Sequence, residues 1–414
     1  MTKILILIGG HLCNAPRPCK EADALTNQGY EVTIGGVWFH PEYIERDRLL
    51  ILNKKWKFKA IVDFQPNKIV NNWIFRMRSR FAREIFRRFG IFSPDLLGYG
   101  AKEMLKYAKK AKADLTIVHS EGGLWVGSHL LDNGFRIGVD FEDWFSEDLL
   151  PEARADRPIK QLKILEKKLI NECSYCLTTS NAMSEAMALA YKSKTPTVIY
   201  NTFPWEERSQ LDNKICDRQN LDIPSIHWFS QTIGQGRGLE ILFQALAHIN
   251  QPIEIHLRGN YPESSRRWLE PQISPEWRDR LFIHPTVPNN ELLSRIAEHD
   301  IGLALEVSDI PSRNLTITNK FFQYLQAGLA IIATDTKGQS EIIFKHPEIG
   351  RLILTDDPLV LAKAIENVSH IPENLKKAKL TSLHAAQEKF CWEFEIEKIV
   401  QLADEALQIK TQTK

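Results

Sequence analysis

The stretch IHWFSQTIGQGRGLEILFQAL, residues 226–246, decides the fold of the second half of the chain. It begins with a short run typical of a strand, passes through a turn that contains Gly234, Gly236 and Gly238, and ends in an apolar helical pattern. A glycine-rich turn at the start of a helix exposes backbone N–H groups, and the helix dipole favours an anion there. Arg237 adds a guanidinium suited to forked contacts with phosphate. The stretch therefore predicts a strand–turn–helix unit that binds a diphosphate.

The same alternation of short strands and helices runs along the whole chain. The strand-like runs are KILILI, EVTIGGV, DLTIVHS, FRIGVDF, YCLTTS and TVIYN in the first half, and IHWFS, IEIHLRG, LFIHP, IGLALE, AIIATD and GRLIL in the second. Helix-length segments between them predict an α/β protein with parallel sheets. We expect two doubly wound, Rossmann-like domains over residues 1–200 and 215–380, a linker over 201–214, and a C-terminal helix over 381–414 that packs back on the first domain.

The bulk composition narrows the class of protein. The 414 residues are 43% hydrophobic and 25% charged, as in a globular protein of more than one domain. The 53 basic residues balance the 52 acidic ones, so no nucleic-acid partner is expected. No apolar run reaches the roughly 18 residues of a membrane span, and ILILIGG near the N-terminus reads as a strand rather than a signal peptide. The six scattered cysteines predict neither a disulfide framework nor a zinc site, so we expect a cytoplasmic protein.

An arginine-rich segment, NNWIFRMRSRFAREIFRRFGIF over residues 71–92, interrupts the strand–helix pattern. Six arginines alternate with aromatic and aliphatic residues in it. Two interpretations stay open. The segment is either a solvated helix that covers the sheet, or a basic aromatic face that rests on an anionic membrane or holds an anionic acceptor.

Ligands of open parallel sheets bind beyond the carboxyl ends of the strands, so the residues that follow each strand are candidates. Gly9 and Gly10 follow the first strand, His119 ends DLTIVHS, and Glu142 and Asp143 follow FRIGVDF. Carboxylates at a strand end can accept hydrogen bonds from sugar hydroxyls or act as a general base. They serve equally well as helix caps in a solvated loop.

The second half carries two further candidate sites. Lys320 lies in the first turn of the helix predicted for NKFFQYLQAG, residues 319–328. A positive charge is unfavourable there unless an anion shares the site or the side chain points into water. The strand IEIHLRG ends at Arg258 and Gly259. An arginine at that strand end suits the 2′-phosphate of NADP, which keeps an NADP-dependent enzyme as an alternative.

The order and spacing of these segments resemble the retaining GT-B glycosyltransferases of the group 1, family 4-like type. PRPCKEADALTNQGYEV, VDFEDWFSEDL, SNAMSEAM and VIYNTFP are similar to the acceptor-side domain, and SQTIGQGRGLE, LRGN, NKFFQYLQAG and IIATDTKGQSEII to the donor domain. The resemblance implies two Rossmann-like domains across a cleft and transfer of a sugar from a UDP- or GDP-sugar to a hydroxyl of a glycan or lipid-linked acceptor. It implies retention, no metal and no permanently bound cofactor. The implied setting is polysaccharide assembly, with peripheral contact at the inner membrane face through 71–92.

The resemblance also assigns roles to individual residues. Arg237 matches the arginine against the donor diphosphate, and Lys320 supplies a second charge. Roles in orienting the acceptor fall to His119, Glu142 and Asp143. The donor-binding set is Gly234, Gly236, Arg258, Gly259, Asn260, Glu306, Gln323 and Glu341, and the acceptor-side set is Gly9, Gly10 and Arg17.

The chain departs from the family pattern at both of its paired glutamates. Gln323 stands where the glutamate that holds the donor ribose is found, and Leu315 stands at the earlier position. In addition, Phe141 stands near the place of a common histidine. An amide offers one oxygen acceptor, and losing a charge-assisted bond costs about 1 to 2 kcal/mol. We therefore expect weakened donor binding, and a non-catalytic sugar-nucleotide-binding or partner protein on the same fold stays an alternative.

Overall fold

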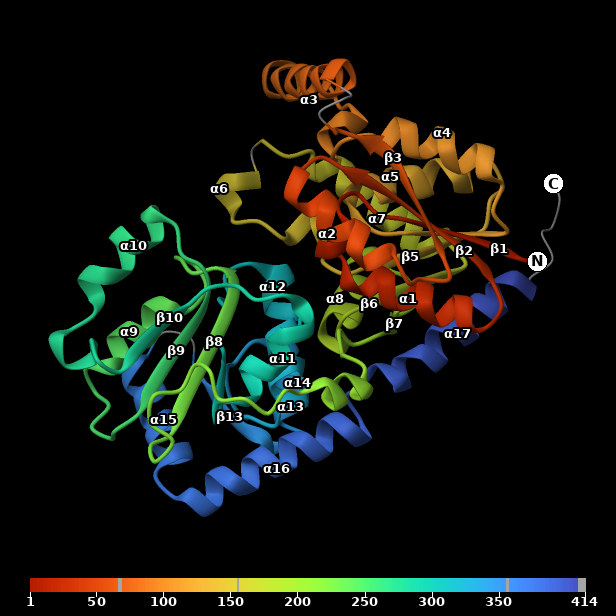
Figure 1. Cartoon of the computed structure of the whole chain (residues 1–414). Helices are drawn as coiled ribbons and strands as arrows, with labels where there is room; N and C mark the ends of the chain where they lie inside the picture. Colours follow the sequence, from red (N-terminus) through yellow and green to blue (C-terminus); the bar gives the residue numbers. More distant parts are fainter. Residues whose placement is uncertain (66–68, 155, 355–356, 409–414) are drawn as a thin grey trace. The chain divides into compact units, whose positions relative to one another are not determined.

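The computed structural model describes residues 1–65, 69–154, 156–354 and 357–408. The chain forms two compact units. The first comprises Met1–Ile199 together with Ile396–Lys414, and the second comprises Tyr200–Glu395 (Figure 1). The last six residues of the C-terminal helix expected over 381–414 lie outside the described residues.

The first unit is built on a parallel sheet of seven strands in the order β3-β2-β1-β4-β5-β6-β7. From β1 the chain adds β2 and β3 on one side and then β4 to β7 on the other. The switch point between β1 and β4 is where open α/β sheets bind ligands. The strands are β1 (Lys3–Leu7), β2 (Glu31–Trp38), β3 (Lys57–Asp63), β4 (Leu115–Val118), β5 (Ile137–Phe141), β6 (Tyr175–Thr178) and β7 (Thr197–Val198).

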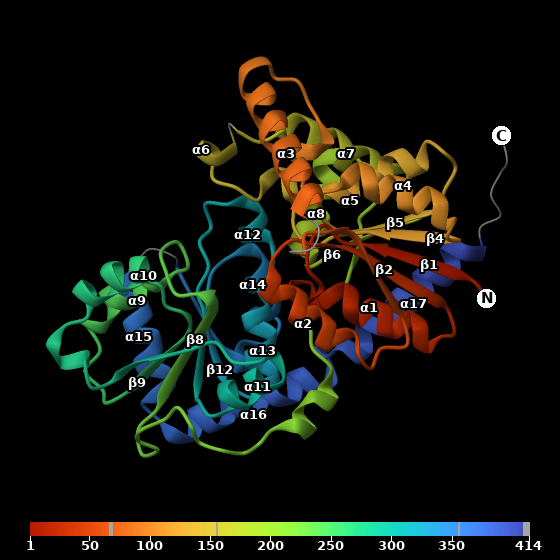
Figure 2. The ribbon, with the colours of Figure 1, turned by 45° about the horizontal axis from the view of Figure 1, so that its top comes forward.

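Helices cover both faces of this sheet. Figure 2 shows α4, α5 and α7 on one face and α1, α2 and α17 on the other. The helices of the first unit are α1 (Pro16–Asn27), α2 (Pro41–Ile51), α3 (Ile69–Phe89), α4 (Ala101–Ala111), α5 (Ser120–Leu131), α6 (Pro151–Arg154), α7 (Ile159–Glu172), α8 (Asn181–Tyr191) and α17 (Trp392–Gln408), which begins in the second unit.

The second unit repeats the plan with six parallel strands in the order β10-β9-β8-β11-β12-β13. The strands are β8 (Ser225–Thr232), β9 (Glu254–Asn260), β10 (Leu281–His284), β11 (Ile301–Ala304), β12 (Ala330–Thr334) and β13 (Gly350–Ile353). The helices are α9 (Leu239–Leu246), α10 (Glu263–Leu269), α11 (Asn289–Ala297), α12 (Pro311–Leu315), α13 (Asn319–Ala327), α14 (Lys337–Ile343), α15 (Pro358–Ser369) and α16 (Pro372–Glu388). The expected α/β class with two Rossmann-like domains is confirmed.

Buried apolar residues explain the strands that the sequence predicts. β1, β4, β5, β11 and β12 are buried along almost their whole length, as expected for central parallel strands covered by helices on both faces. β3 was not expected, because KFKAIVD is mostly exposed or half-buried. It lies at the edge of its sheet, where charged side chains are common.

The unit boundaries lie at other residues than those of the expected domains. The stretch 201–214, expected as a linker, belongs to the second unit, where the backbone N–H of Trp205 donates to Glu393 Oε1 at 2.9 Å. The C-terminal region contains two helices, α16 and α17, in place of one. No helix in the described part of the chain has the length and hydropathy needed to cross a membrane.

Candidate functional site

The backbone after β1, at the ligand-binding edge of the first sheet, is held by the buried side chains of His11 and Asp47. His11 Nδ1 lies 3.2 Å from Asp47 Oδ2. The ring nitrogen Nε2 accepts hydrogen bonds from the backbone N–H groups of Phe39 and His40, each at 3.0 Å. Because Nε2 accepts twice, Nδ1 carries the proton and donates it to Asp47. This network fixes the loop that contains the predicted glycine pair.

The two glycines of that loop differ in their surroundings. A Cβ atom on Gly9 would lie 2.5 Å from Ser120 Oγ, at the turn between β4 and α5. Ser120 itself has φ +68°, a left-handed conformation that is unusual for serine. A Cβ atom on Gly10 would meet no described atom within 4 Å. The loop backbone therefore lies against the β4–α5 turn at Gly9 and is open at Gly10.

Five charged side chains meet at the same edge of the first sheet: Arg17, Glu21, His119, Asp140 and Glu142. Arg17 Nε donates to Asp140 Oδ2 at 2.5 Å. His119 Nδ1 lies 2.7 Å from Glu142 Oε1, and Nε2 lies 3.0 Å from Glu21 Oε2. Four of the five side chains are buried, whereas that of Glu142 is 30% exposed. Glu142 is thus the member of this cluster that a ligand can reach.

Electrostatics fixes the protonation of the cluster. Burial alone would lower the pKa of His119, but its bonds to Glu142 and Glu21 raise that pKa to about 10. Burial alone would raise the pKa of Glu142, yet the His119 bond holds it below its usual value. His119 is therefore an imidazolium at neutral pH and no general base, and Glu142 is an ionised acceptor for hydroxyl groups. Asp143 follows it half-buried.

The predicted glycine-rich turn of the second unit lies between β8 and α9. Gly236 and Gly238 have φ values of +69° and +77°, and Gly236 N donates to Glu240 Oε1 at 2.6 Å. A Cβ atom on Gly238 would lie 2.4 Å from Leu305 Cβ, so the turn packs on the segment after β11. The side chain of Arg237 is exposed and has no partner among the described residues.

Glu306 follows Leu305 and forms a buried ion pair with Lys320 at the start of α13. Lys320 Nζ lies 2.9 Å from Glu306 Oε1, with side chains 9% and 8% exposed. Nζ also lies 5.4 Å from the centre of the Trp228 ring. The backbone N–H of Glu306 donates to Thr334 Oγ1 at 2.9 Å. The lysine in the first turn of α13 therefore has a carboxylate of its own chain as its counter-ion, and Glu306 fixes its position beside the glycine-rich turn.

Gln323 lies one helical turn after Lys320. Along α13 only Asn319 and Gln323 escape burial, and the Gln323 amide has no hydrogen-bond partner among the described residues. By contrast, Gln326 on the same helix is buried and donates to the carbonyl of Pro204 at 2.6 Å. Leu315, which stands where the family pattern has the earlier glutamate, is buried at the end of α12. The Gln323 amide is thus half-exposed and unbonded among the described residues, whereas the Gln326 amide has a structural role.

Three of the remaining donor-side candidates border the glycine-rich turn between β8 and α9, and the fourth lies on α14. A Cβ atom on Gly259 would lie 2.7 Å from the Ser230 carbonyl, and the carbonyl of Asn260 accepts from Ile233 N at 3.0 Å, so both border the turn. Gly234 begins the turn, and Cβ there would lie 3.7 Å from Ser265 Oγ. On α14, Glu341 Oε1 accepts from Tyr200 Oη at 3.0 Å.

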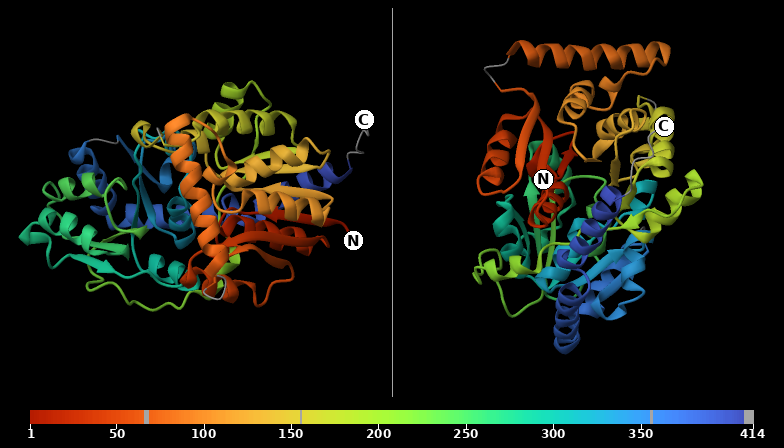
Figure 3. Two further views of the ribbon diagram at one scale, coloured as in Figure 1. Left: turned by 90° about the horizontal axis from the view of Figure 1, so that it is seen from above. Right: turned by 90° about the vertical axis from the view of Figure 1, so that its right-hand side faces the viewer.

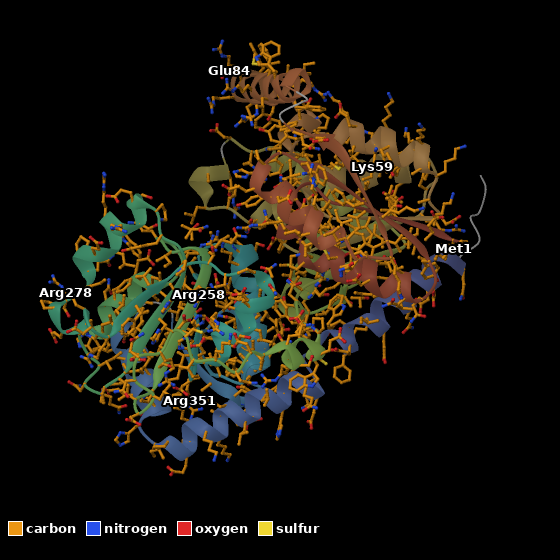
Figure 4. All side chains as sticks on the ribbon, viewed as in Figure 1. Met1, Lys59, Glu84, Arg258, Arg278 and Arg351 are labelled. Atoms are coloured by element: carbon orange, nitrogen blue, oxygen red, sulfur yellow. The ribbon has the colours of Figure 1, made fainter. Side chains whose placement is uncertain are left out.

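Arg258, labelled in Figure 4, is buried within the second unit. Its side chain is 3% exposed, pairs with Asp217, and donates from Nη1 to the Pro285 carbonyl at 2.7 Å. A guanidinium with these partners is directed into the protein rather than toward the 2′-phosphate of a cofactor. The NADP alternative therefore loses the residue on which it rested.

Four histidines surround this ion pair: His227, His256, His284 and His299. His256 Nδ1 lies 3.0 Å from His284 Nε2, and the rings of His227 and His299 stack with centroids 4.7 Å apart. His284 Nδ1 lies 3.3 Å from Asp217 Oδ1. Burial and the neighbouring imidazoles lower the pKa of His256 to about 2, and the pKa values of the other three are also lowered. The core of the second unit thus holds four neutral imidazoles.

Sequence reasoning missed two residues at this edge of the first sheet: Glu21, which bonds to His119 in the charged cluster, and Asp47, which holds the loop after β1. A signal for Glu21 was present, because Arg17 and Glu21 are four residues apart on a helix face that also carries Ala22 and Leu25. Charged residues on the apolar face of a helix are expected to have buried partners. Among the described residues no group of three or more His, Cys, Asp or Glu is arranged to hold a metal ion.

Comparison with known proteins supports the fold and one family. Residues 224–370 match the model of the family Glycosyl transferases group 1, which spans β8 to α15 of the second unit. No curated protein matches the sequence.

Solved structures match nearly the whole chain. A sucrose-phosphate synthase from Thermosynechococcus elongatus has a TM-score of 0.71 at 16% identity, over 99% of this chain and 100% of that one. A glycosyltransferase from Rickettsia africae has a TM-score of 0.68 at 13% identity, over 99% of both chains. Anabaena Alr3699/HepE in complex with UDP-glucose has a TM-score of 0.67 at 15% identity, over 98% and 100%. These likenesses establish the GT-B fold, so the expected fold class is confirmed, and the match to the group 1 family model covers part of the second unit.

Proposed function

We propose that the chain is a glycosyltransferase that moves a sugar from a nucleoside-diphosphate donor to a hydroxyl group. The second unit holds the donor and the first holds the acceptor. The match of residues 224–370 to the glycosyltransferase group 1 model supports the reaction class. We place the reaction in the cytoplasm, because all six cysteines are free thiols, as is usual in that reducing compartment.

The observation that carries the proposal is the packing of the glycine-rich turn on the segment that holds Glu306. The contact between Gly238 and Leu305 brings exposed backbone and Arg237 to the same edge as the Lys320–Glu306 pair. Backbone N–H groups at a helix start together with two cations form a site for a diphosphate leaving group. Glu306 holds Lys320 in place before the donor arrives, so little side-chain ordering is needed on binding.

We propose UDP as the donor nucleotide, because the similar Anabaena structure contains UDP-glucose. Gln323 binds the donor ribose through its unpaired, half-exposed amide. The donor phosphate itself assists the incoming hydroxyl, which gives retention of configuration without a protein nucleophile or a metal ion. The enzyme then contributes positioning and charge stabilisation.

The acceptor, a glycan or a lipid-linked sugar, meets the cluster of the first unit. Glu142 accepts a hydroxyl hydrogen bond, and Asp143 and the open backbone at Gly10 add further polar contacts. His119 is a positioning residue, since its charge is locked between Glu142 and Glu21. Arg17 serves the same end by holding Asp140.

The test is a calorimetric titration of the wild type and of Gln323→Glu with UDP, GDP, ADP and CMP. We expect saturable binding of UDP that becomes about 5- to 30-fold tighter in the variant, because a carboxylate accepts two charge-assisted bonds. Gln387→Glu is the matched control, since it makes the same charge change on the exposed side of α16 and should leave affinity unchanged.

A turnover assay separates catalysis from binding. Release of UDP from UDP-glucose in the presence of a sugar acceptor supports the proposal. Tight UDP binding without turnover of any UDP-sugar, in either the wild type or Gln323→Glu, would instead identify a non-catalytic nucleotide-sugar-binding protein. Absence of binding by all four nucleotides would reject the donor site.

A further inference from the structure

Two cysteines meet at the end of α7, in the stretch CSYC over residues 173–176. Cys173 is the C-cap of α7, and its backbone N–H donates to the Leu169 carbonyl at 3.0 Å. Cys176 lies in β6, opposite Val139 of β5. Both views in Figure 3 show this yellow-green part of the chain on the side of the first unit away from the red strands β2 and β3. The pair thus lies where a helix ends and a strand begins.

The two thiols are in contact with each other. Cys173 Sγ and Cys176 Sγ are 3.0 Å apart, so a sulfur–sulfur bond of about 2.05 Å needs an approach of only about 1 Å. Cys173 Sγ also lies 3.0 Å from the Tyr175 carbonyl, and Cys176 Sγ lies 3.8 Å from the Leu169 carbonyl. The other four cysteines are free thiols with no sulfur as a hydrogen-bond partner in the described part of the chain.

The two thiols differ in their access to solvent. Cys173 is half-buried, whereas Cys176 is 9% exposed. The hydrogen bond with Cys173, together with burial, raises the pKa of Cys176 well above its usual value. Cys176 therefore stays a neutral thiol at neutral pH, and Cys173 is the sulfur that an oxidant from solution meets first.

We propose that Cys173 and Cys176 form a reversible intramolecular disulfide by exchange with a small disulfide such as oxidised glutathione. The Cys173 thiolate attacks the small disulfide, breaks its S–S bond, forms a mixed disulfide and releases one small thiolate. Cys176 Sγ then attacks Cys173 Sγ and releases the second small thiolate. Each protein thiol gives its proton to one of the released thiolates. Two protein thiols thus become one disulfide while one small disulfide becomes two thiols, and none of this depends on the proposed function.

The contact between the sulfurs favours this outcome over the other fates of a thiol pair. An intramolecular thiol acts at a high effective concentration, so a mixed disulfide at Cys173 is resolved by Cys176 rather than kept. A zinc ion would need further ligands, and the described residues contain no group of three or more His, Cys, Asp or Glu arranged to hold a metal ion. In a reducing compartment the pair rests as two thiols and is oxidised when disulfides accumulate.

The test is equilibration of the full chain in glutathione buffers, followed by an acid quench, alkylation in denaturant and mass spectrometry. We expect the wild type to lose two of its six alkylatable thiols together, and the tryptic peptide over residues 169–192 to carry an internal disulfide. Doubling total glutathione at a fixed ratio of its two forms should halve the ratio of oxidised to reduced protein, because two small thiols are released. A mixed disulfide releases one and would show no such change.

Single variants separate the two sulfurs. Cys176→Ser should accumulate a glutathione adduct at Cys173 that does not respond to total glutathione at a fixed ratio, whereas Cys173→Ser should leave the buried Cys176 unmodified. Cys13→Ser and Cys19→Ser are the matched controls, since both thiols are half-buried in the same unit and contact carbonyl oxygens instead of sulfur. Both should form the disulfide like the wild type, and circular dichroism should show that all variants fold.

Several results would overturn the proposal. They are six free thiols at the most oxidising ratio, a disulfide that includes Cys13 or Cys19, and a wild-type adduct that Cys176 does not resolve. Oxidation that begins only when urea unfolds the chain would overturn it as well, because the native contact between the two sulfurs would then play no part.

Discussion

The buried pair of Lys320 and Glu306 allows a sharp test of the donor-side geometry. With Nζ and Oε1 at 2.9 Å and less than a tenth of either side chain exposed, water screens the pair very little. Lys320→Met leaves the Glu306 carboxylate buried without its counter-ion. Removing one partner of a buried ion pair typically costs about 3 to 5 kcal/mol, and we expect a loss of unfolding free energy in that range.

The double variant Lys320→Met/Glu306→Gln removes the charge imbalance as well. We expect it to recover at least half of the loss, because a buried pair replaced by uncharged groups of similar size is often nearly neutral. The exposed pair of Arg267 and Glu263, with side chains 78% and 64% exposed, is the control. Arg267→Met should cost less than about 1 kcal/mol.

The measurement is urea unfolding, with amide hydrogen exchange of α13 as a local readout because two units need not unfold together. A Lys320→Met variant within about 1 kcal/mol of the wild type would refute the reasoning, since the pair would then be solvated. A double variant as unstable as the single one would show that Lys320 stabilises the unit through packing rather than charge.

Three further outcomes are expected. His256 stays neutral when folded but takes a proton when unfolded, so this residue alone should lower the unfolding free energy by about 1.4 kcal/mol per pH unit below about pH 6.5, in addition to what the other three histidines of the cluster contribute; His256→Gln should reduce the slope in urea titrations by about that amount, and an unchanged slope would contradict its assignment. Gly238→Ala should destabilise the chain by about 1 to 3 kcal/mol more than Gly236→Ala, which meets no described atom within 4 Å; equal thermal shifts would contradict the packing. Gly9→Ala should destabilise the first unit, because its methyl group would lie 2.5 Å from Ser120 Oγ, and adding Ser120→Gly should restore stability. Thermal unfolding of the single and double variants tests this, and a failed rescue would mean that another contact excludes the methyl group.

Most of the fold could be predicted because its strands are buried on both faces. All six predicted strands of the second unit are found, and six of the seven in the first. β3 was not predicted, because it forms an exposed edge of the sheet and its sequence lacks a clear apolar pattern. The break between α16 and α17 was not predicted either, because both helices are amphipathic and no clear stop signal separates their apolar patterns.

The candidate site could be predicted only where the residues are neighbours in sequence. The glycine-rich turn and the start of α13 were found from local patterns alone. Arg258 looked like a ligand residue because its partner Asp217 lies 41 positions away, and Glu21 lies 98 positions from His119. Whether a charged side chain faces a ligand or a buried counter-ion depends on such distant contacts, which sequence spacing does not reveal.

The division of the chain has a consequence for how the protein is made. The second unit is continuous from Tyr200 to Glu395, whereas the first is completed only by residues after 395. Two residues of α17 bond to the rest of the first unit: Asp404 accepts from Tyr30 Oη, and Lys398 Nζ donates to the Val198 carbonyl at 3.5 Å. On the ribosome the first unit must therefore wait, without its last helix, until the whole second unit has been synthesised. A nascent chain stalled just after Glu395 would expose an unfinished first unit to chaperones when every residue of the second unit has already been made.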